Sequence, residues 1–248
     1  MGHTAAAVPA VTQPAFAAEA AGAVRQLLAL GPDALARALH VSGRTAAESA
    51  LRLHRFLEPS QEPVPAVLAY TGIVFRYLHP ETFTAADFSY AQRHLFITSF
   101  LYGLLRPLDG IRPYRLEGNV RLPDADGPTR FAYWQPRLTD LLIKAVQADD
   151  GVLVNLASAE MKRLFDWRRV CASVRVVTPE FRVMDGGRLR SVVVYAKMCR
   201  GAMARFILQQ RLPDVAGLSA FNPSPDDAVG QLPVVVGGLD GRAVSPGR

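Results

Sequence analysis

Three short segments of the sequence concentrate side chains that bind anions or move protons. The first is a Gly-, Pro- and Arg-rich loop from Tyr102 to Glu117. Arginine binds phosphate and carboxylate groups through two parallel N–H donors, and a nearby carboxylate such as Glu117 is a candidate catalytic group for proton transfer. The candidate ligand-binding residues of this loop are Arg106, Arg112, Tyr114 and Arg115. The alternative is a surface loop whose own arginine–carboxylate pairs fix its shape.

The second segment runs from Asn155 to Glu160, where a short buried strand is expected to end and a helix to begin. Backbone N–H groups at the start of a helix lack partners within the helix, and the helix dipole favours negative charge there. Asn155 and Ser158 are therefore candidate ligand-binding residues, and Glu160 is a candidate catalytic group. A plain N-cap followed by an acid in the first turn explains the pattern equally well.

The third segment is an expected helix over 197–212, preceded by Tyr195. At about 100° per residue, Gly201 shares one face with the basic residues, and the opposite face is apolar. Glycine inside a helix costs about 1 kcal/mol relative to alanine, which indicates that something approaches the backbone there. The candidate site residues are Lys197 and Tyr195 for catalysis and Arg200 and Arg205 for ligand binding. The alternative is a basic face in contact with solvent.

Positive charge is concentrated around the second and third segments. The 248 residues carry 28 basic and 22 acidic side chains, yet Glu160 to Arg211 alone contains 12 basic and four acidic ones. Such a basic segment implies an anionic partner, either DNA phosphates or a small anionic substrate. The alternative explanation is compositional, because 25 of the 28 basic residues are arginine, as is typical of a GC-rich genome.

Composition excludes several classes of protein. Half of the residues are apolar, which is enough for a core and too many for a disordered chain. No apolar stretch approaches the roughly 20 residues of a membrane span, so no membrane association is expected. The five histidines show no ligand spacing, and no metal or cofactor is expected. The chain has only two cysteines, Cys171 and Cys199, and their spacing is not that of a disulfide framework. A reducing cytoplasm is therefore expected, with both thiols buried.

Hydrophobic periodicity predicts an α+β fold, a mixed sheet with surrounding helices. Helices are expected over 131–146 and 197–212, and strands over 151–156, 170–183 and 189–195, the last two joined by a turn at 185–187. The chain divides into a flexible N-terminus (1–14), a single domain (15–222) and a largely irregular C-terminal tail (223–248).

Taken together and in this order, the three segments resemble the YaaA family of peroxide-stress proteins. The matching pieces, which cover about residues 65–222, are Tyr70–Gly72, Glu81–Phe88, Tyr102–Asp109, Pro113–Glu117, Tyr133–Trp134, Asn155–Glu160, Tyr195–Lys197, Arg200–Gly201, Arg205–Ile207 and Phe221–Asn222. The resemblance implies an intracellular α+β protein with a positively charged cleft and a helix-hairpin-helix-like element. It also implies DNA binding and a role in limiting oxidative damage linked to free iron, with no established enzymatic reaction.

Two departures from the family pattern leave a second interpretation open. Family members open with a strand and a Ser-Pro-Ala/Ser-Lys-Thr segment, which nothing before Phe16 matches. A Gly-Asp-x-Tyr-x-Gly element is replaced by Gly72 to Tyr77, so polar groups of the presumed cleft are lost. These losses favour the alternative of a repurposed enzyme of specialised, natural-product metabolism, acting on a small anionic or aromatic substrate. The sequence does not decide whether the protein is an enzyme.

Overall fold

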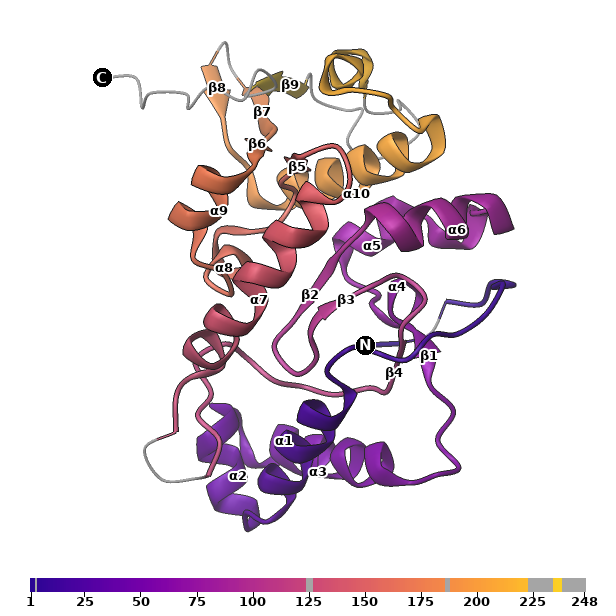
Figure 1. The fold of residues 1–248 in the computed structure, drawn as a ribbon. Helices are drawn as coiled ribbons and strands as arrows, with labels where there is room; N and C mark the ends of the chain where they lie inside the picture. The colour runs from indigo at the N-terminus through magenta and orange to yellow at the C-terminus, as the bar shows by residue number, and fades with distance from the viewer. Residues whose placement is uncertain (3, 124–126, 186–187, 223–233, 238–248) are drawn as a thin grey trace.

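Helices of four to 18 residues and short strands make up the chain in the computed structural model (Figure 1). The structure describes residues 1–2, 4–123, 127–185, 188–222 and 234–237. Within these residues the strands form separate sheets of two or three strands instead of one larger mixed sheet. The expected α+β class is confirmed, with the strands divided among small sheets.

Helices occur along the chain from residue 17 to residue 210. They are α1 (Ala17–Leu28), α2 (Pro32–Leu39), α3 (Gly43–Leu57), α4 (Ala66–Ala69), α5 (Ile73–Leu78), α6 (Ala85–His94), α7 (Arg130–Gln147), α8 (Ala159–Lys162), α9 (Trp167–Ser173) and α10 (Val193–Gln210), with 3₁₀ turns at Pro80–Thr82 and Val215–Ala220. Polar N-caps define several starts: the side chains of Ser42, Thr84, Thr129, Ser158 and Asp166 each accept a backbone N–H of the helix that follows.

The strands are short and mostly antiparallel. They are β1 (Val64–Pro65), β2 (Ile97–Ser99), β3 (Gly103–Leu105), β4 (Gly110–Ile111), β5 (Val152–Val154), β6 (Arg175–Val177), β7 (Glu180–Asp185), β8 (Arg188–Arg190) and β9 (Val234–Gly237). The pairs β1–β4 and β2–β3 are antiparallel, β5–β6 is parallel, and β7 lies between β8 and β9 in an antiparallel sheet.

Two of the expected strands differ from the structure. The stretch 170–183 contains the end of α9, all of β6 and the start of β7, because the Asp166 cap starts a helix ahead of it. The stretch 189–195 is divided between β8 and the first turn of α10. Its β-branched residues Val193 and Val194 are exposed on that helix, so the packing of α10 as a whole overrides their local strand preference. The residues 186–187 of the expected turn lie outside the described residues.

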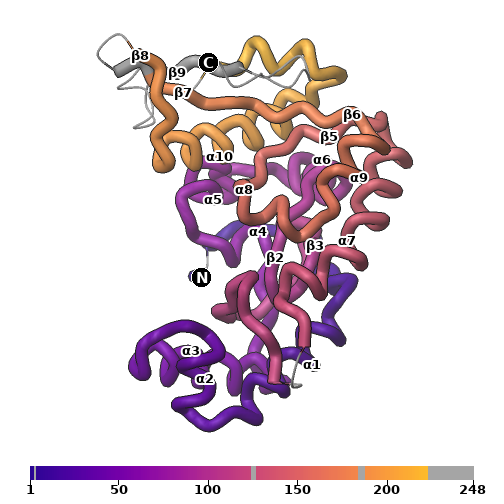
Figure 2. The backbone as a smooth tube through the Cα atoms, turned by 90° about the vertical axis from the view of Figure 1, so that its left-hand side faces the viewer, coloured from indigo at the N-terminus to yellow at the C-terminus, as the bar shows by residue number. Residues whose placement is uncertain are grey.

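The buried core has two parts. The larger surrounds Trp134 of α7, which is fully buried and donates its indole N–H to the carbonyl oxygen of Phe100 at 2.8 Å. The smaller lies beneath α10 and includes Cys199 and Met203 with Phe181 of β7. Helices α1 to α3 form one end of the molecule, and α10 with β7 to β9 forms the other (Figures 1 and 2).

The N-terminal segment lies along the larger core. The N–H groups of Gly2 and Thr4 donate to the carbonyl oxygens of Ala69 and Leu68, and Thr12 pairs with Asp109. The flexibility of residues 1–14 stays a prediction. Most of the tail from 223 onward lies outside the described residues, and its described part is β9, paired with β7.

The two cysteines have different environments. Cys199 is buried as expected, and burial raises the pKa of its thiol to about 11, which disfavours the reactive thiolate. The burial expected for Cys171 is wrong, because it lies on an exposed position of α9.

In the part of the chain that the structure describes, no helix has the length and apolar character needed to cross a bilayer. The same residues contain no cluster of three metal-ligating side chains.

Candidate functional site

The loop from Tyr102 to Glu117 holds two of its arginines in internal contacts. Arg106 donates from Nη1 to the carbonyl oxygen of Arg93 at 2.8 Å, and its guanidinium lies 3.6 Å from the centre of the Phe96 ring. Burial lowers the pKa of Arg106. Arg112 donates from Nε to the carbonyl oxygen of Gln61 at 2.8 Å and from Nη1 to that of Phe56 at 3.0 Å. These contacts fix the loop against its neighbours, as the shape-fixing alternative describes.

Tyr114 lies in a chain of three hydroxyl groups. Its hydroxyl oxygen is 2.7 Å from that of Ser99 and 2.8 Å from that of Tyr70. The Ser99 oxygen also accepts the backbone N–H groups of Leu101 and Tyr102, at 3.2 and 2.8 Å. Because a hydroxyl oxygen has two lone pairs, Ser99 must give its own proton to Tyr114. Either tyrosine could donate in the Tyr70–Tyr114 pair; because Tyr114 is the more deeply buried and buried hydroxyl groups are hydrogen-bonded, we assign Tyr114 as the donor to Tyr70. The Tyr70 proton then has no acceptor among the described residues.

Tyr70 and Tyr114 line a cavity of about 260 Å³, called here the Tyr70 cavity. Its walls are Met1, Tyr70, Thr98, Ser99, Phe100, Tyr114, Arg115, Leu116, Glu117 and Met161. Three of the candidate residues, Tyr114, Arg115 and Glu117, therefore meet at one place. Arg115 donates from Nη2 to Oε1 of Glu117 at 3.0 Å, and both side chains are about half exposed.

The second segment forms a strand end and a helix cap, as expected. Asn155 is buried; its Oδ1 accepts the N–H of Ala157 at 3.1 Å, and its Nδ2 donates to Thr178 at 3.2 Å. Ser158 Oγ accepts the N–H of Met161 at 3.2 Å and so caps the short helix α8. Glu160 is exposed in the first turn of α8, next to Met161, which lines the Tyr70 cavity. The first and second segments thus approach each other at this cavity.

The third segment forms α10, where the group that approaches Gly201 is helix α5. A Cβ atom at Gly201 would overlap the carbonyl oxygen of Val74 and would lie 2.9 Å from Cβ of Tyr77. Gly201 is therefore buried by a helix crossing, and the glycine is explained without a ligand. The expected division into one basic and one apolar face holds only in part, since both sides of α10 contribute buried residues.

The polar residues of α10 differ in their exposure and in their hydrogen bonds. Lys197 is exposed, and Tyr195 and Arg200 are partly buried. Burial lowers the pKa of Arg200, and within the described ranges this guanidinium has no hydrogen bond and no ion pair. Arg205 differs, because its Nε donates to Oε1 of Gln209 at 3.2 Å. Arg200 is therefore a positively charged group in a partly dehydrated place, and no acid of the described residues compensates its charge.

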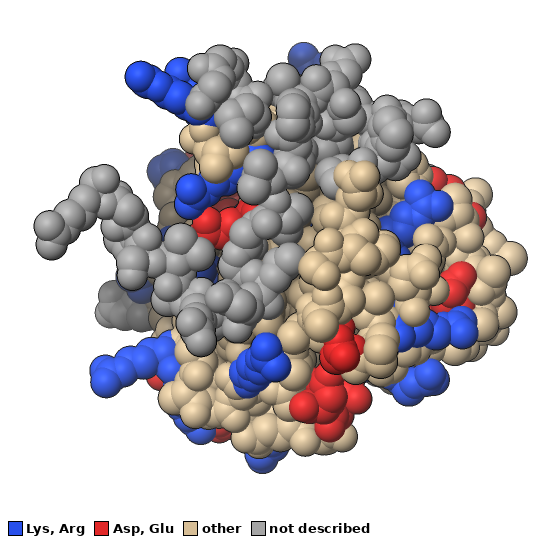
Figure 3. Space-filling model, turned by 90° about the horizontal axis from the view of Figure 1, so that it is seen from above, with Lys and Arg blue, Asp and Glu red and all other residues tan. Residues whose placement is uncertain are grey.

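The basic segment as a whole is only partly neutralised. Its ion pairs in the described part of the chain are Arg169–Asp140, Arg182–Glu180 and Arg211–Asp87. The basic residues with no acid within ion-pair distance among the described residues include Lys162, Arg163, Arg168, Arg175, Lys197 and Arg200. Figure 3 shows that Lys and Arg side chains are spread over the face seen from above and do not gather in one patch.

The structure adds residues that the sequence patterns did not single out as site residues. Tyr70 and Ser99 complete the hydroxyl chain, and Met1 contributes to the same cavity, where its sulfur accepts the N–H of Tyr114 at 3.4 Å. Tyr70 belongs to a matching family piece, which was the only signal for it. A chain of hydroxyl groups from residues 70, 99 and 114 is visible only once the fold brings them together.

Comparison with known proteins decides the family. A family model described as "Peroxide stress protein YaaA" matches residues 2–225. The chain belongs to this family. The match begins well before residue 65, where the recognised motifs begin, so the N-terminal quarter of this YaaA-family protein is part of the shared sequence. Relatives named UPF0246 protein occur in several bacteria.

Three of these relatives illustrate the extent of the similarity. The protein from Bacteroides thetaiotaomicron is 51% identical over 215 residues, which is 87% of this chain and 84% of the relative. The protein from Phocaeicola vulgatus is 49% identical over 213 residues, 86% of this chain and 84% of the relative. The protein from Porphyromonas gingivalis is 49% identical over 191 residues, 76% of this chain and 74% of the relative.

Proposed function

We propose that this YaaA-family protein serves the peroxide-stress role of its family by binding DNA through its phosphates. The observation that carries the proposal is the state of Arg200 on α10. Burial lowers its pKa, and no acid among the described residues compensates its charge. A cation held in this way is stabilised by an incoming anion, because the anion supplies the missing opposite charge.

The distribution of the other basic residues favours a polyanion over one small anion. Lys197 lies one helical turn before Arg200, and further basic residues on α8, α9 and β6 have no acid within ion-pair distance among the described residues. A spread of positive side chains suits contacts with successive phosphates, which position a protein on DNA without reading its sequence. We therefore expect weak, sequence-independent binding in a cytoplasmic setting, with a basic surface formed by the third segment and its neighbours.

Fluorescence anisotropy with a labelled DNA duplex tests this function. Each phosphate contact contributes about 0.9 to the slope of log K against log salt concentration, so binding should weaken steeply as salt is added. A second duplex of unrelated sequence should bind with the same affinity. Absence of binding to both duplexes at low salt, or an affinity that does not change with salt, would contradict the proposal.

The Tyr70 cavity favours a second candidate function, an enzyme acting on a small anionic or aromatic substrate. The Tyr70 hydroxyl in its wall can donate a hydrogen bond, and the Arg115–Glu117 pair also lines the cavity. There Arg115 would orient a substrate, and Glu117 or Glu160 would accept a proton. Incubation with a small-molecule extract, followed by mass spectrometry, tests this function. One metabolite should disappear with the wild type and persist with Glu117→Gln, and no change with the wild type would contradict it.

A further inference from the structure

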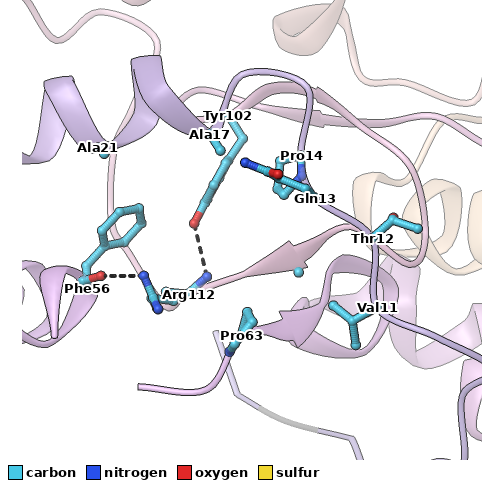
Figure 4. A pocket seen from close by; sticks show the side chains of 11 residues that line it. Val11, Thr12, Gln13, Pro14, Ala17, Ala21, Phe56, Pro63, Tyr102 and Arg112 are labelled. Atoms are coloured by element: carbon cyan, nitrogen blue, oxygen red, sulfur yellow. Dashed lines mark hydrogen bonds between the residues drawn. The ribbon is translucent and has the colours of Figure 1, made fainter. Parts of the chain in front are cut away.

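We propose that a second cavity, at the opposite end of the loop, binds a small aromatic carboxylate. This cavity, called here the Arg112 cavity, has a volume of about 420 Å³ and lies between the N-terminal segment, α1 and the end of α3 (Figure 4). It shares no lining residue with the Tyr70 cavity and includes none of the basic segment. The inference is therefore independent of the proposed DNA binding and of the alternative enzyme.

Arg112 supplies a fixed positive charge at this cavity. Its Nε and Nη1 atoms are held by the carbonyl oxygens of Gln61 and Phe56, which set the orientation of the guanidinium. Its Nη2 atom has no hydrogen-bond partner, and no acid lies within ion-pair distance, among the described residues. A guanidinium that is already oriented loses little conformational freedom when it binds an anion. The unused N–H groups of Nη2 are therefore suited to a carboxylate.

Tyr102 adds a directed hydrogen-bond donor beside Arg112. Its side chain is only 3% exposed, and its hydroxyl oxygen accepts the backbone N–H of Arg112 at 3.1 Å. The hydroxyl proton must then point elsewhere, and no acceptor for it is present in the described part of the chain. Figure 4 shows the Tyr102 hydroxyl at the wall of the cavity, pointing towards the backbone of Arg112. A ligand oxygen placed there would satisfy the proton of a buried phenol.

The remaining residues of the cavity wall are mainly apolar and therefore favour an apolar ring for the rest of the ligand. Phe56 and Pro63 contribute apolar surface, and Ala17 and Ala21 line the α1 side with side chains that leave space (Figure 4). A cavity of a few hundred Å³ with apolar walls and a few convergent polar groups is the usual form of a small-molecule site. A planar ring against the apolar wall, with its carboxylate at Arg112 and Tyr102, uses every feature of the cavity.

Titration of the ¹⁵N-labelled full chain with phenylacetate tests the proposal. Saturable amide shifts should appear at Gln13, Tyr102 and Arg112. The variant Ala17→Leu fills the cavity from α1 and should weaken binding by about tenfold or more, because the ring loses its place. The matched control is Ala18→Leu, one residue along the same helix at an exposed position, which should bind like the wild type.

A second ligand tests the charge without any change to the protein. Phenylacetamide has the same shape but no negative charge, so its affinity should be lower by about tenfold, since charge-assisted hydrogen bonds are about twice as strong as neutral ones. Equal affinity for the two compounds would overturn the proposal. It would also be overturned by the absence of saturable shifts at the three residues, or by unchanged binding to a correctly folded Ala17→Leu variant.

Discussion

The hydroxyl oxygens of Tyr70 and Tyr114 lie 2.8 Å apart, at the end of a chain that begins at Ser99. Two backbone N–H groups occupy the acceptor sites of Ser99, so Ser99 donates to Tyr114. Tyr114, the more deeply buried of the two tyrosines, is assigned as the donor to Tyr70, so the protons point from Ser99 towards Tyr70. The two tyrosines therefore differ in role. Tyr114 both accepts and donates inside the chain, whereas Tyr70 accepts within it and offers its own proton to the cavity.

This direction predicts unequal effects of removing the two hydroxyl groups. Tyr114→Phe leaves the buried Ser99 proton without its acceptor, and we expect a loss of about 1–3 kcal/mol in the free energy of unfolding. Tyr70→Phe leaves the Tyr114 proton unpaired beside a cavity that admits water, so a loss of only about 0.5–1.5 kcal/mol is expected. Urea unfolding measures both. A larger loss for Tyr70→Phe would contradict the assigned direction.

Burial of tyrosines predicts a fall in stability at alkaline pH. Burial raises the pKa of Tyr70, Tyr102 and Tyr114 above the ordinary value of 10.0. Below pH 10 these groups are protonated in both states. Above it the unfolded chain releases their protons while the folded chain keeps them, so stability is lost as pH rises from about 10 towards the folded pKa values.

Phenolate absorbance during a pH titration checks this expectation. A group of tyrosines should ionise only together with the loss of circular dichroism, as the fold opens. If all seven tyrosines of the chain ionised while the circular dichroism stayed unchanged, the buried positions of these three would be wrong.

The crossing of α5 and α10 predicts opposite results for two glycine substitutions. Gly201→Ala forces a Cβ atom onto the Val74 carbonyl, and we expect a loss of about 1–3 kcal/mol in stability. Gly22 also lies inside a helix, α1, but no atom lies within 4 Å of a Cβ built there. Gly22→Ala should therefore raise stability by about 0.4–1 kcal/mol. Thermal unfolding of the pair tests this, and equal effects at the two positions would contradict the close crossing.

Local patterns in the sequence were sufficient for much of the fold. The amphipathic pattern over 131–146 gave α7, and the Ser158 cap was correctly placed because capping depends on residues near in sequence. Of the strand expected over 189–195, only residues 189–190 belong to a strand, β8. Val193 and Val194 favour strands locally, but they begin α10, which is stabilised by packing against distant elements. The requirement for glycine at position 201 also could not be predicted locally, because it comes from the close approach of α5, which precedes α10 by more than a hundred residues.

The candidate site was predicted less completely. Arg115, Glu117 and Tyr114 meet at the Tyr70 cavity, and Met161 next to Glu160 joins them. Arg106 and Arg112 instead donate to backbone carbonyl oxygens. Sequence spacing shows which arginines lie near one another along the chain, but whether a guanidinium faces a backbone carbonyl or open space depends on the tertiary fold.

The most direct test of DNA binding is the salt dependence of anisotropy for single variants of the basic segment. Lys197→Ala and Arg200→Ala should each weaken binding and lower the slope of log K against log salt by about 0.9, while thermal unfolding shows an intact fold. Arg205→Ala should have a smaller effect, because Gln209 holds that side chain. Arg52→Ala on α3, exposed at the other end of the molecule, should leave the slope unchanged. An unchanged slope for both Lys197→Ala and Arg200→Ala would contradict phosphate binding by α10.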